Sequence, residues 1–407
     1  MPRSTGHTKY RFFINLDVSV RTGRTVFTMS LTLVSQATAM LLANSTKIPL
    51  PIPIAPVATL NVIGLLHYDL QTTLTRILNG VVHIGVDICG IVTNIINIIV
   101  FVRVGLVDSV TITLFSLAVS DVWFLVFYII LQVNYMLTVV LGLEPYVRLT
   151  TLSYLIAWYM NLFNDISILI TVFTAVQKSA CVAIPLLFKN VFTRLRVTAV
   201  ILGIYGAMVV YYLPTFVSQG FKQYFDVALN RTRLGYTSQP YRNLLSEIYK
   251  IFNRMFLPFT SQVVIIICMF IMSYRLKQAS LLRHKMTGDK DGGDREAGMD
   301  KVMMNPKEIR AIQVVNLVSA IFVVCNLPDI FIFFCSIYYP EFNDYGKYEI
   351  SFKLAQAIQK LLTVISATVN VVVYYKFNTK YRNTFNEMLK VMFHPSQSSG
   401  KEKSFHK

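Results

Sequence analysis

Long apolar runs separated by short polar segments occupy most of the chain from residue 80 onward. About 20 apolar residues in a helix cross the hydrocarbon core of a bilayer. In lipid each run must satisfy its own backbone hydrogen bonds, which a helix does. Seven runs have this length, at residues 80–103, 110–133, 150–178, 196–217, 246–275, 309–338 and 350–375. The pattern predicts an all-α membrane protein with a bundle of seven transmembrane helices over residues 80–378.

The segments outside this bundle are more polar, and most are predicted to be irregular. Residues 1–79 are expected to form an extracellular segment, in which residues 1–39 are either a cleaved signal peptide or a disordered leader. The Gly-rich charged stretch GDKDGGDREAG predicts a disordered cytoplasmic loop over 276–308, and a disordered cytoplasmic tail is expected over 394–407. Residues 379–393 have the periodicity of an amphipathic helix on the membrane surface.

The composition supports a membrane protein and argues against nucleic-acid binding. Only 14% of the 407 residues are charged, against about 25% in soluble proteins. The net charge of +17 is concentrated in segments between and after the apolar runs, as in membrane proteins with basic cytoplasmic loops. The five cysteines lie in apolar runs or at their ends, without metal-ligand spacing, which is typical of small buried hydrophobic residues.

Two features indicate that the N-terminus lies outside the cell. Lys and Arg cluster at the membrane ends of the 276–308 loop and of the tail, which assigns both to the cytoplasm. The glycosylation sequons at Asn44 and Asn230 then lie outside, where glycosylation occurs. We therefore expect a multi-pass protein of the plasma membrane, and the lipid bilayer is one of its expected partners.

The third run differs from the others because polar residues lie halfway along it. They are Asn161, Asn164, Asp165 and Ser167, and the run ends in Gln177-Lys178-Ser179. A charged side chain at bilayer depth costs about 2.5–3.5 kcal/mol even on lenient scales, so it normally faces protein or water. We expect the middle of this helix to face a ligand cavity and its end to face a cytoplasmic partner.

Short motifs in several spans match those of a known family. They are Asn94 in the first span, Leu117 to Asp121 (LAxxD) in the second, Val182 to Leu186 (V-x-x-P-L) after the third, Pro258 in the fifth, Phe322, Cys325 and Pro328 in the sixth, and Asn370 with Tyr374 in the seventh. Over residues 80–393 the chain resembles the rhodopsin-like (class A) G-protein-coupled receptors, and among them gastropod chemosensory receptors and invertebrate peptide receptors. The resemblance implies an extracellular small-molecule or peptide ligand and a heterotrimeric G protein as partner.

Several positions depart from the family pattern. Gln177-Lys178-Ser179 stands where the family has Asp/Glu-Arg-Tyr, and Lys lacks the planar fork of donors that Arg has. Asn326 and Val371 replace a Trp and a Pro. The family's disulfide would join the region of Ser153 to residues 218–245, and neither has a Cys, so that tie is expected to be absent.

The resemblance also implies a polar switch and a G-protein face. The switch residues are Asn94, Asp121, Ser167, Ser366, Asn370 and Tyr374, where the Asp121 carboxylate either binds Na⁺ or is a hydrogen-bonded buried Asp without an ion. The G-protein face comprises Gln177, Lys178, Ser179 and Glu308. Lys178 and Glu308 either form a pair worth about 0–1 kcal/mol or are two solvated charges.

The outer half of the bundle is expected to hold the ligand. The candidate ligand-binding residues are Asn161, Asn164, Asp165, Asn326, Asp329, Lys360, Lys250 and Arg254. Charges of both signs suit a zwitterionic ligand such as an amino acid or short peptide; alternatively, Asp165 and Arg254 neutralise each other. Met160 and Val364 stand where amine receptors have an Asp and opsins a retinal Lys, which argues against those two classes.

Other functions fit the sequence less well. No nucleophile accompanies a His and a carboxylate, so catalysis is not indicated, and no cofactor is implied beyond Na⁺ at Asp121. A ligand-gated channel of the insect odorant receptor type has its N-terminus inside the cell, whereas both topology features here place it outside. Transporters usually show two halves related by a repeat, and no such repeat is found in this sequence. A non-signalling decoy with the receptor fold stays open because of Gln177-Lys178-Ser179.

Overall fold

A computed structural model describes residues 68–143, 147, 149–227, 229–238, 241–288 and 306–393. The leader, the Asn44 sequon, the middle of the long cytoplasmic loop and the tail therefore lie outside the described residues. Glu308 lies in a described helix, but its side chain is among those not described, so the predicted pair with Lys178 also lies outside them.

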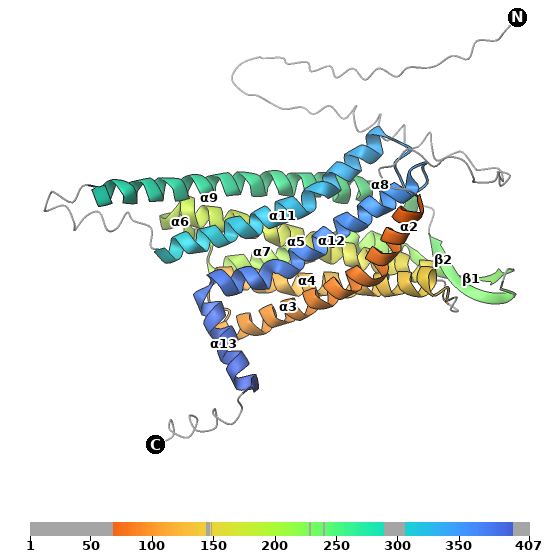
Figure 1. Ribbon diagram of the computed structural model, residues 1–407, viewed down its shortest axis with the longest axis horizontal. Helices are drawn as coiled ribbons and strands as arrows, with labels where there is room; N and C mark the ends of the chain where they lie inside the picture. The colour runs from red at the N-terminus through yellow and green to blue at the C-terminus, as the bar shows by residue number, and fades with distance from the viewer. Residues whose placement is uncertain are drawn as a thin grey trace, which may run out of the picture. The chain divides into compact units, whose positions relative to one another are not determined.

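Long helices running in alternating directions form the body of the molecule (Figure 1). In chain order the elements are α2 (Tyr68–Ile77), the π-helical turn η1 (Leu78–Val82), α3 (His83–Val104), α4 (Ser109–Tyr135), the π-helical turn η2 (Met136–Val140), α5 (Leu149–Ala183), α6 (Pro185–Val191), α7 (Arg194–Val217), β1 (Gln219–Asp226), β2 (Arg231–Ser238), α8 (Arg242–Ile251), the π-helical turn η3 (Phe252–Phe256), α9 (Leu257–Gly288), α11 (Pro306–Tyr338), α12 (Glu349–Phe377) and α13 (Thr379–Phe393). Seven helical segments are long and apolar enough to cross a membrane. The predicted fold class is confirmed.

Local sequence signals explain where several helices begin and end. The Asp108 carboxylate accepts hydrogen bonds from the backbone N–H groups of Val110 and Thr111 and so caps α4. The hydroxyl of Thr193 does the same for α7. Gly105, with a φ of +90°, ends α3 in a conformation that side chains disfavour.

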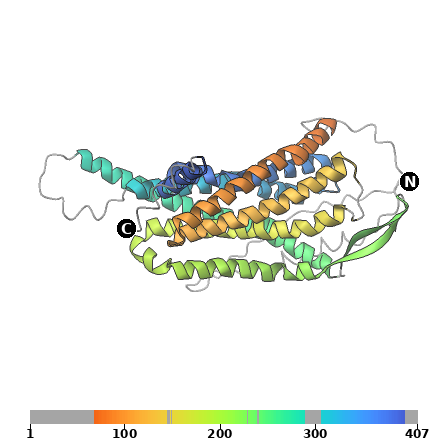
Figure 2. The same ribbon diagram turned by 90° about the horizontal axis from the view of Figure 1, so that it is seen from below.

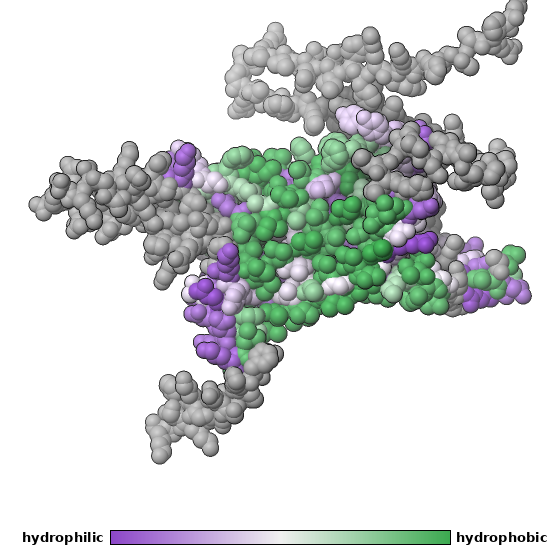
Figure 3. All heavy atoms as spheres, in the orientation of Figure 1, coloured by the Kyte–Doolittle hydropathy of each residue, from purple (hydrophilic) through white to green (hydrophobic). Residues whose placement is uncertain are grey.

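Helix α3 shows how the bundle places its residues in a membrane. Its exposed face is apolar and follows helical spacing through Ile88, Val92, Ile95, Ile99 and Val102. Its buried face carries the polar residues, including His83, Asp87, Asn94 and Asn97. Over the rest of the bundle the surface is likewise hydrophobic, with hydrophilic residues gathered toward the two ends (Figure 3). Apolar residues outside and polar residues inside are what a bilayer demands.

Two predicted boundaries and one connection differ from the structure. The first transmembrane segment begins at Tyr68 rather than at residue 80, so residues 68–79 are helical and not irregular. The helix α9 continues to Gly288 and α11 begins at Pro306, so the predicted disorder is wrong for residues 276–288 and 306–308. The connection between the fourth and fifth spans contains a β-hairpin that the hydropathy pattern does not indicate.

This hairpin projects from the end of the bundle opposite α13 (Figures 1 and 2). Its strands are antiparallel, with Gln219 opposite Ser238 and Asp226 opposite Arg231. Asn230 in the turn has a φ of +47°, which Asn tolerates better than most residues. The guanidinium of Arg233 pairs with the Asp226 carboxylate at 3.1 Å and so links the two strands.

Noncovalent contacts join the hairpin to the outer end of α5. Val147, just before α5, forms an isolated β-bridge with Leu234. The rings of Tyr154 and Tyr236 lie 4.6 Å apart between centroids. All five cysteines are free, so no disulfide contributes. Cys89 and Cys181 are exposed, which corrects the expectation that every cysteine is buried.

At the other end of the bundle, α13 packs against α3 and α12. Tyr381 and Met388 of α13 are buried with Val100, Phe101 and Tyr374 in one hydrophobic cluster. The charged residues Lys380, Glu387 and Lys390 of the same helix are exposed. Contact of α13 with the membrane surface stays a prediction.

We expect Gly90→Ala to lower the midpoint of thermal unfolding of the purified protein in lipid nanodiscs. A Cβ atom at Gly90 would lie 2.7 Å from Thr368 Oγ1 and 2.8 Å from Leu125 Cδ1, so either these two side chains or the helices that carry them must shift. Overpacking of this kind costs about 1–3 kcal/mol.

Gly85→Ala on the same helix is the matched control, because no atom lies within 4 Å of a Cβ there. Its midpoint should stay level or rise, since Ala has the higher helix propensity. Equal midpoints for the two variants would contradict close packing at Gly90.

Candidate functional site

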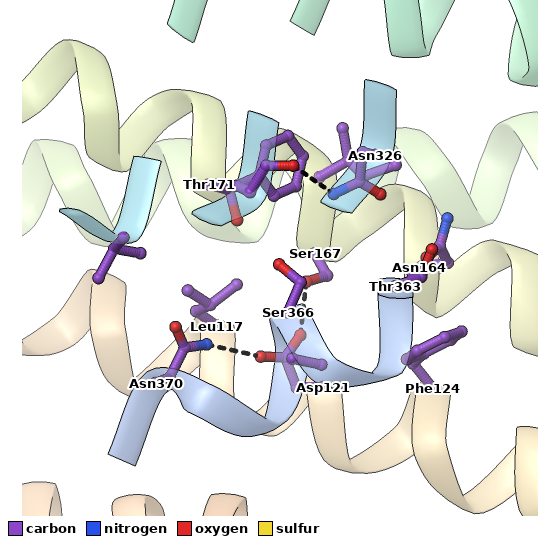
Figure 4. A pocket seen from close by; sticks show the side chains of 14 residues that line it. Leu117, Asp121, Phe124, Asn164, Ser167, Thr171, Asn326, Thr363, Ser366 and Asn370 are labelled. Carbon is purple, nitrogen blue, oxygen red and sulfur yellow. Dashed lines mark hydrogen bonds between the residues drawn. The ribbon is translucent and has the colours of Figure 1, made fainter. Parts of the chain in front are cut away.

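Polar side chains from α4, α5 and α12 converge on Asp121 inside the bundle (Figure 4). Asp121 is only 2% exposed. Ser167 Oγ donates a hydrogen bond to Asp121 Oδ1 at 2.5 Å, and Asn370 Nδ2 donates to Asp121 Oδ2 at 3.4 Å. Ser366 lines the same cavity. The structure thus brings together four of the six residues that the resemblance assigned to the polar switch.

The cavity beside Asp121 has a volume of about 30 Å³. Its polar lining comes from Asp121, Asn164, Ser167, Thr171, Asn326, Thr363, Ser366 and Asn370. A cavity needs roughly 10–15 Å³ of such space to hold one water molecule, so this cavity has room for a water or a bare cation. Asn164 and Asn326, expected to bind ligand, therefore share a small cavity with the predicted switch residues.

The donor set of this cavity fits a hard cation. Carboxylate, hydroxyl and amide oxygens are the ligands that such ions prefer. Each oxygen of Asp121 already accepts one hydrogen bond, but a carboxylate offers about four lone-pair sites. Among the described residues no group of three His, Cys, Asp or Glu could hold a metal ion, so one carboxylate supplies the negative charge here.

Asn94 begins a chain of hydrogen bonds that leads from α12 to α13. Asn94 Nδ2 donates to the Ala367 carbonyl at 2.9 Å, and its Oδ1 accepts from Asn97 Nδ2 at 3.3 Å. Tyr381 Oη then donates to Asn97 Oδ1 at 2.7 Å. Tyr374 lies beside this chain, with its ring centroid 5.8 Å from that of Tyr381. Asn97 and Tyr381 were not among the predicted switch residues.

Gln177, near the C-terminal end of α5, joins this helix to the N-terminal end of α4. Its Oε1 accepts a hydrogen bond from Thr113 Oγ1 and its Nε2 donates to Ser109 Oγ, both at 3.1 Å. Gln177 is fully buried, whereas Lys178 beside it is half-buried and interacts electrostatically with Asp108. Ser179 Oγ lies 3.5 Å from Cys268 Sγ of α9. These three residues thus contact the helices on both sides of α5.

Asp165 connects α5 to the fourth and fifth spans. Its Oδ2 accepts hydrogen bonds from Tyr212 Oη at 2.6 Å and from Asn253 Nδ2 at 2.8 Å. The Asn164 side chain also donates to this carboxylate. Within the described part of the chain Asp165 forms no ion pair with Arg254, so the proposed neutralisation of these two charges is wrong. Neutral donors from neighbouring helices satisfy the carboxylate instead.

Charged residues from the last three spans meet in the outer half of the bundle. Lys360 of α12 interacts electrostatically with Asp329 of α11, Arg254 of η3 and Asp165 of α5. Lys360 and Asp329 are half-buried, and Arg254 is exposed. This arrangement brings together four of the five charged residues expected to project inward.

The remaining candidates have other surroundings. The Lys250 side chain is 58% exposed and pairs with Glu247 one turn away, so it does not project inward as expected. Asn326 Nδ2 donates to the Phe322 carbonyl of its own helix at 2.9 Å. Asn161 is half-buried on α5.

Two further buried polar residues on α3 were not predicted from the sequence. His83 and Asp87 are both 0% exposed. His83 Nε2 lies 3.1 Å from the Ala357 carbonyl of α12, and its ring meets that of Tyr128 edge-on. Neither oxygen of Asp87 has a hydrogen-bond partner among the described residues. The signal was present, because an acidic residue inside an apolar run is a candidate functional residue.

The family model of the serpentine type 7TM GPCR chemoreceptors Srw matches residues 81–392. The chain belongs to this family. A search of curated proteins found no match. The Srw match extends from η1 to within α13, so it includes the Asp121 cavity, the charged outer cluster and Gln177. The match confirms the resemblance to G-protein-coupled receptors and shows a multi-pass membrane protein. The rhodopsin-like (class A) assignment stays a prediction.

Proposed function

We propose that this Srw chemoreceptor binds a zwitterionic ligand, an amino acid or a short peptide, from outside the cell and activates a heterotrimeric G protein. The observation that carries the proposal is the meeting of Asp329, Lys360 and Arg254 in the outer half of the bundle. Asp329 faces the ligand ammonium, and Lys360 with Arg254 faces its carboxylate. Charge-assisted hydrogen bonds of this kind are roughly twice as strong as neutral ones.

The Asp165 network explains why we assign the ligand charges to other residues. The Asp165 oxygen that faces α7 and η3 is already engaged by Tyr212 and Asn253. Removing a carboxylate from such a network would leave buried donors unpaired. Asp165 therefore holds three spans in register beneath the ligand, while Asp329 and Lys360 stay available to it.

Signalling would pass through the polar interior to the cytoplasmic face. Asn326 on α11 lines the cavity that also contains Asp121, so movement of α11 changes the space around that carboxylate. Pro328 lies inside α11 and provides the hinge for such movement. On the cytoplasmic side we assign Lys178 and Glu308 to the surface that contacts the G protein, with Gln177 and Ser179 buried next to Lys178 in the chain.

The proposed function is tested by nucleotide exchange on a purified G protein, with the receptor in nanodiscs and amino acids and short peptides as ligands. We expect ligand-dependent exchange, and Lys360→Gln should raise the half-maximal ligand concentration at least tenfold because the ligand carboxylate loses its partner. Lys353→Gln, an exposed lysine on the same helix that pairs with Glu349, is the control and should match the parent.

A ligand-gated current without nucleotide exchange would instead indicate a channel. Ligand binding with neither response would indicate a decoy receptor. Equal effects of the Lys360 and Lys353 substitutions would overturn the assignment of Lys360.

We further propose that Na⁺ occupies the Asp121 cavity of the inactive receptor. Asp121→Asn keeps the shape of the side chain and removes the charge, so it should abolish the effect of replacing Na⁺ by choline on basal nucleotide exchange. Ser167→Ala, which removes one oxygen, should weaken that effect. An unchanged Na⁺ response in Asp121→Asn would show that the carboxylate is a hydrogen-bonded residue without an ion.

An extracellular N-terminus follows from the same proposal. Asn230 in the exposed turn of the hairpin should then carry a glycan in the full-length protein expressed in animal cells. Asn230→Gln should remove a glycosidase-sensitive increase in apparent mass on gel electrophoresis. Thr232→Ala, which breaks the same sequon, should behave identically, and glycosidase-insensitive parent protein would place the hairpin on the cytoplasmic side.

A further inference from the structure

A second pocket lies outside the polar interior, between the hairpin and the outer end of α5. Its volume is about 420 Å³, which falls within the roughly 300–1,000 Å³ of small-molecule sites. Its lining consists of Thr150, Thr151, Tyr154, Lys222, Tyr224, Gly235 and Tyr236. None of these residues belongs to the ligand set of the outer half of the bundle.

The hairpin register leaves the space beside the Lys222 side chain unfilled. Lys222 pairs directly with Gly235 on the neighbouring strand. Side chains of directly opposed residues lie on the same face of an antiparallel pair, and Gly235 has none. A Cβ atom at Gly235 would lie 2.6 Å from Cε1 of Tyr224, so the glycine also allows the Tyr224 ring to lie across the strand.

The chemistry of the lining favours an anionic ligand with a flat apolar body. Lys222 is the charged residue of the lining, which contains no Asp or Glu. The buried Tyr224 hydroxyl has no hydrogen-bond partner among the described residues. A carboxylate accepts hydrogen bonds from both an ammonium and a phenol, and such bonds to a charged acceptor are stronger than neutral ones. The rings of Tyr154, Tyr224 and Tyr236 offer surfaces on which an aromatic group stacks.

We propose that this pocket binds a small aromatic carboxylate, held by Lys222 and the Tyr224 hydroxyl. The ligand bridges the hairpin and α5, beside the β-bridge of Val147 with Leu234 and the Tyr154–Tyr236 ring contact. Because a ligand that binds only the folded state stabilises it, occupancy also raises the thermal stability of the receptor. This site goes beyond the proposed function and does not depend on G-protein coupling.

The test uses the full chain in nanodiscs, with phenylacetate and indole-3-acetate as probes and phenylacetamide as the neutral analogue. Binding is measured by saturation-transfer NMR and by the shift of the thermal unfolding midpoint. The carboxylates should bind at least tenfold more tightly than the amide, and their affinity should fall as ionic strength rises.

Substitutions separate this pocket from other basic surfaces. Lys222→Gln should lower the carboxylate affinity at least tenfold and leave that of the amide unchanged, whereas Lys222→Arg should retain most of it. Gly235→Val should block both probes, and Lys353→Gln, outside the pocket, should block neither. Equal binding of carboxylate and amide, or full affinity in Lys222→Gln with an unchanged unfolding midpoint of the free protein, would overturn the proposal.

Discussion

The cost of exposing a charged or amide side chain to hydrocarbon controls how this chain folds. A bilayer offers no water to polar groups, so each must find protein partners or a polar cavity. Helix α3 shows the result most simply, with Ile88, Val92 and Ile95 facing outward and Asp87, Asn94 and Asn97 facing inward. This distribution fixes the rotation of each helix about its own axis before any detail of packing is considered.

Helix α5 shares buried polar contacts with several other helices. Ser167 reaches Asp121 of α4, Asp165 reaches Tyr212 of α7 and Asn253 of η3, and Gln177 reaches Ser109 and Thr113 of α4. The helix accordingly contacts α4, α7, α9 and α11. A shift of α5 would therefore disturb its contacts with several spans at once. The uncharged Gln177 makes the contact with α4 a pair of neutral hydrogen bonds rather than an ion pair.

At the hairpin end of the bundle, noncovalent contacts hold the chain together. Without a disulfide, the hairpin depends on its own Arg233–Asp226 pair and on contacts with the start of α5. Weak ties of this kind leave space between the hairpin and the helix, and the pocket beside Lys222 occupies that space. The same absence of a covalent link would let a bound molecule change how firmly the hairpin is held.

The sequence by itself determined the number of spans and the class of fold, because run length and polar content suffice for those inferences. It also located the Asp121 group, since the family motifs occupy equivalent helical positions. It could not determine which partner each buried group takes. Asp165 bonds to Tyr212 and Asn253 rather than to Arg254, Lys250 points away to Glu247, and the hairpin pairs strands that hydropathy alone does not reveal. Those choices depend on distances between helices far apart in the chain, and only the tertiary structure sets such distances.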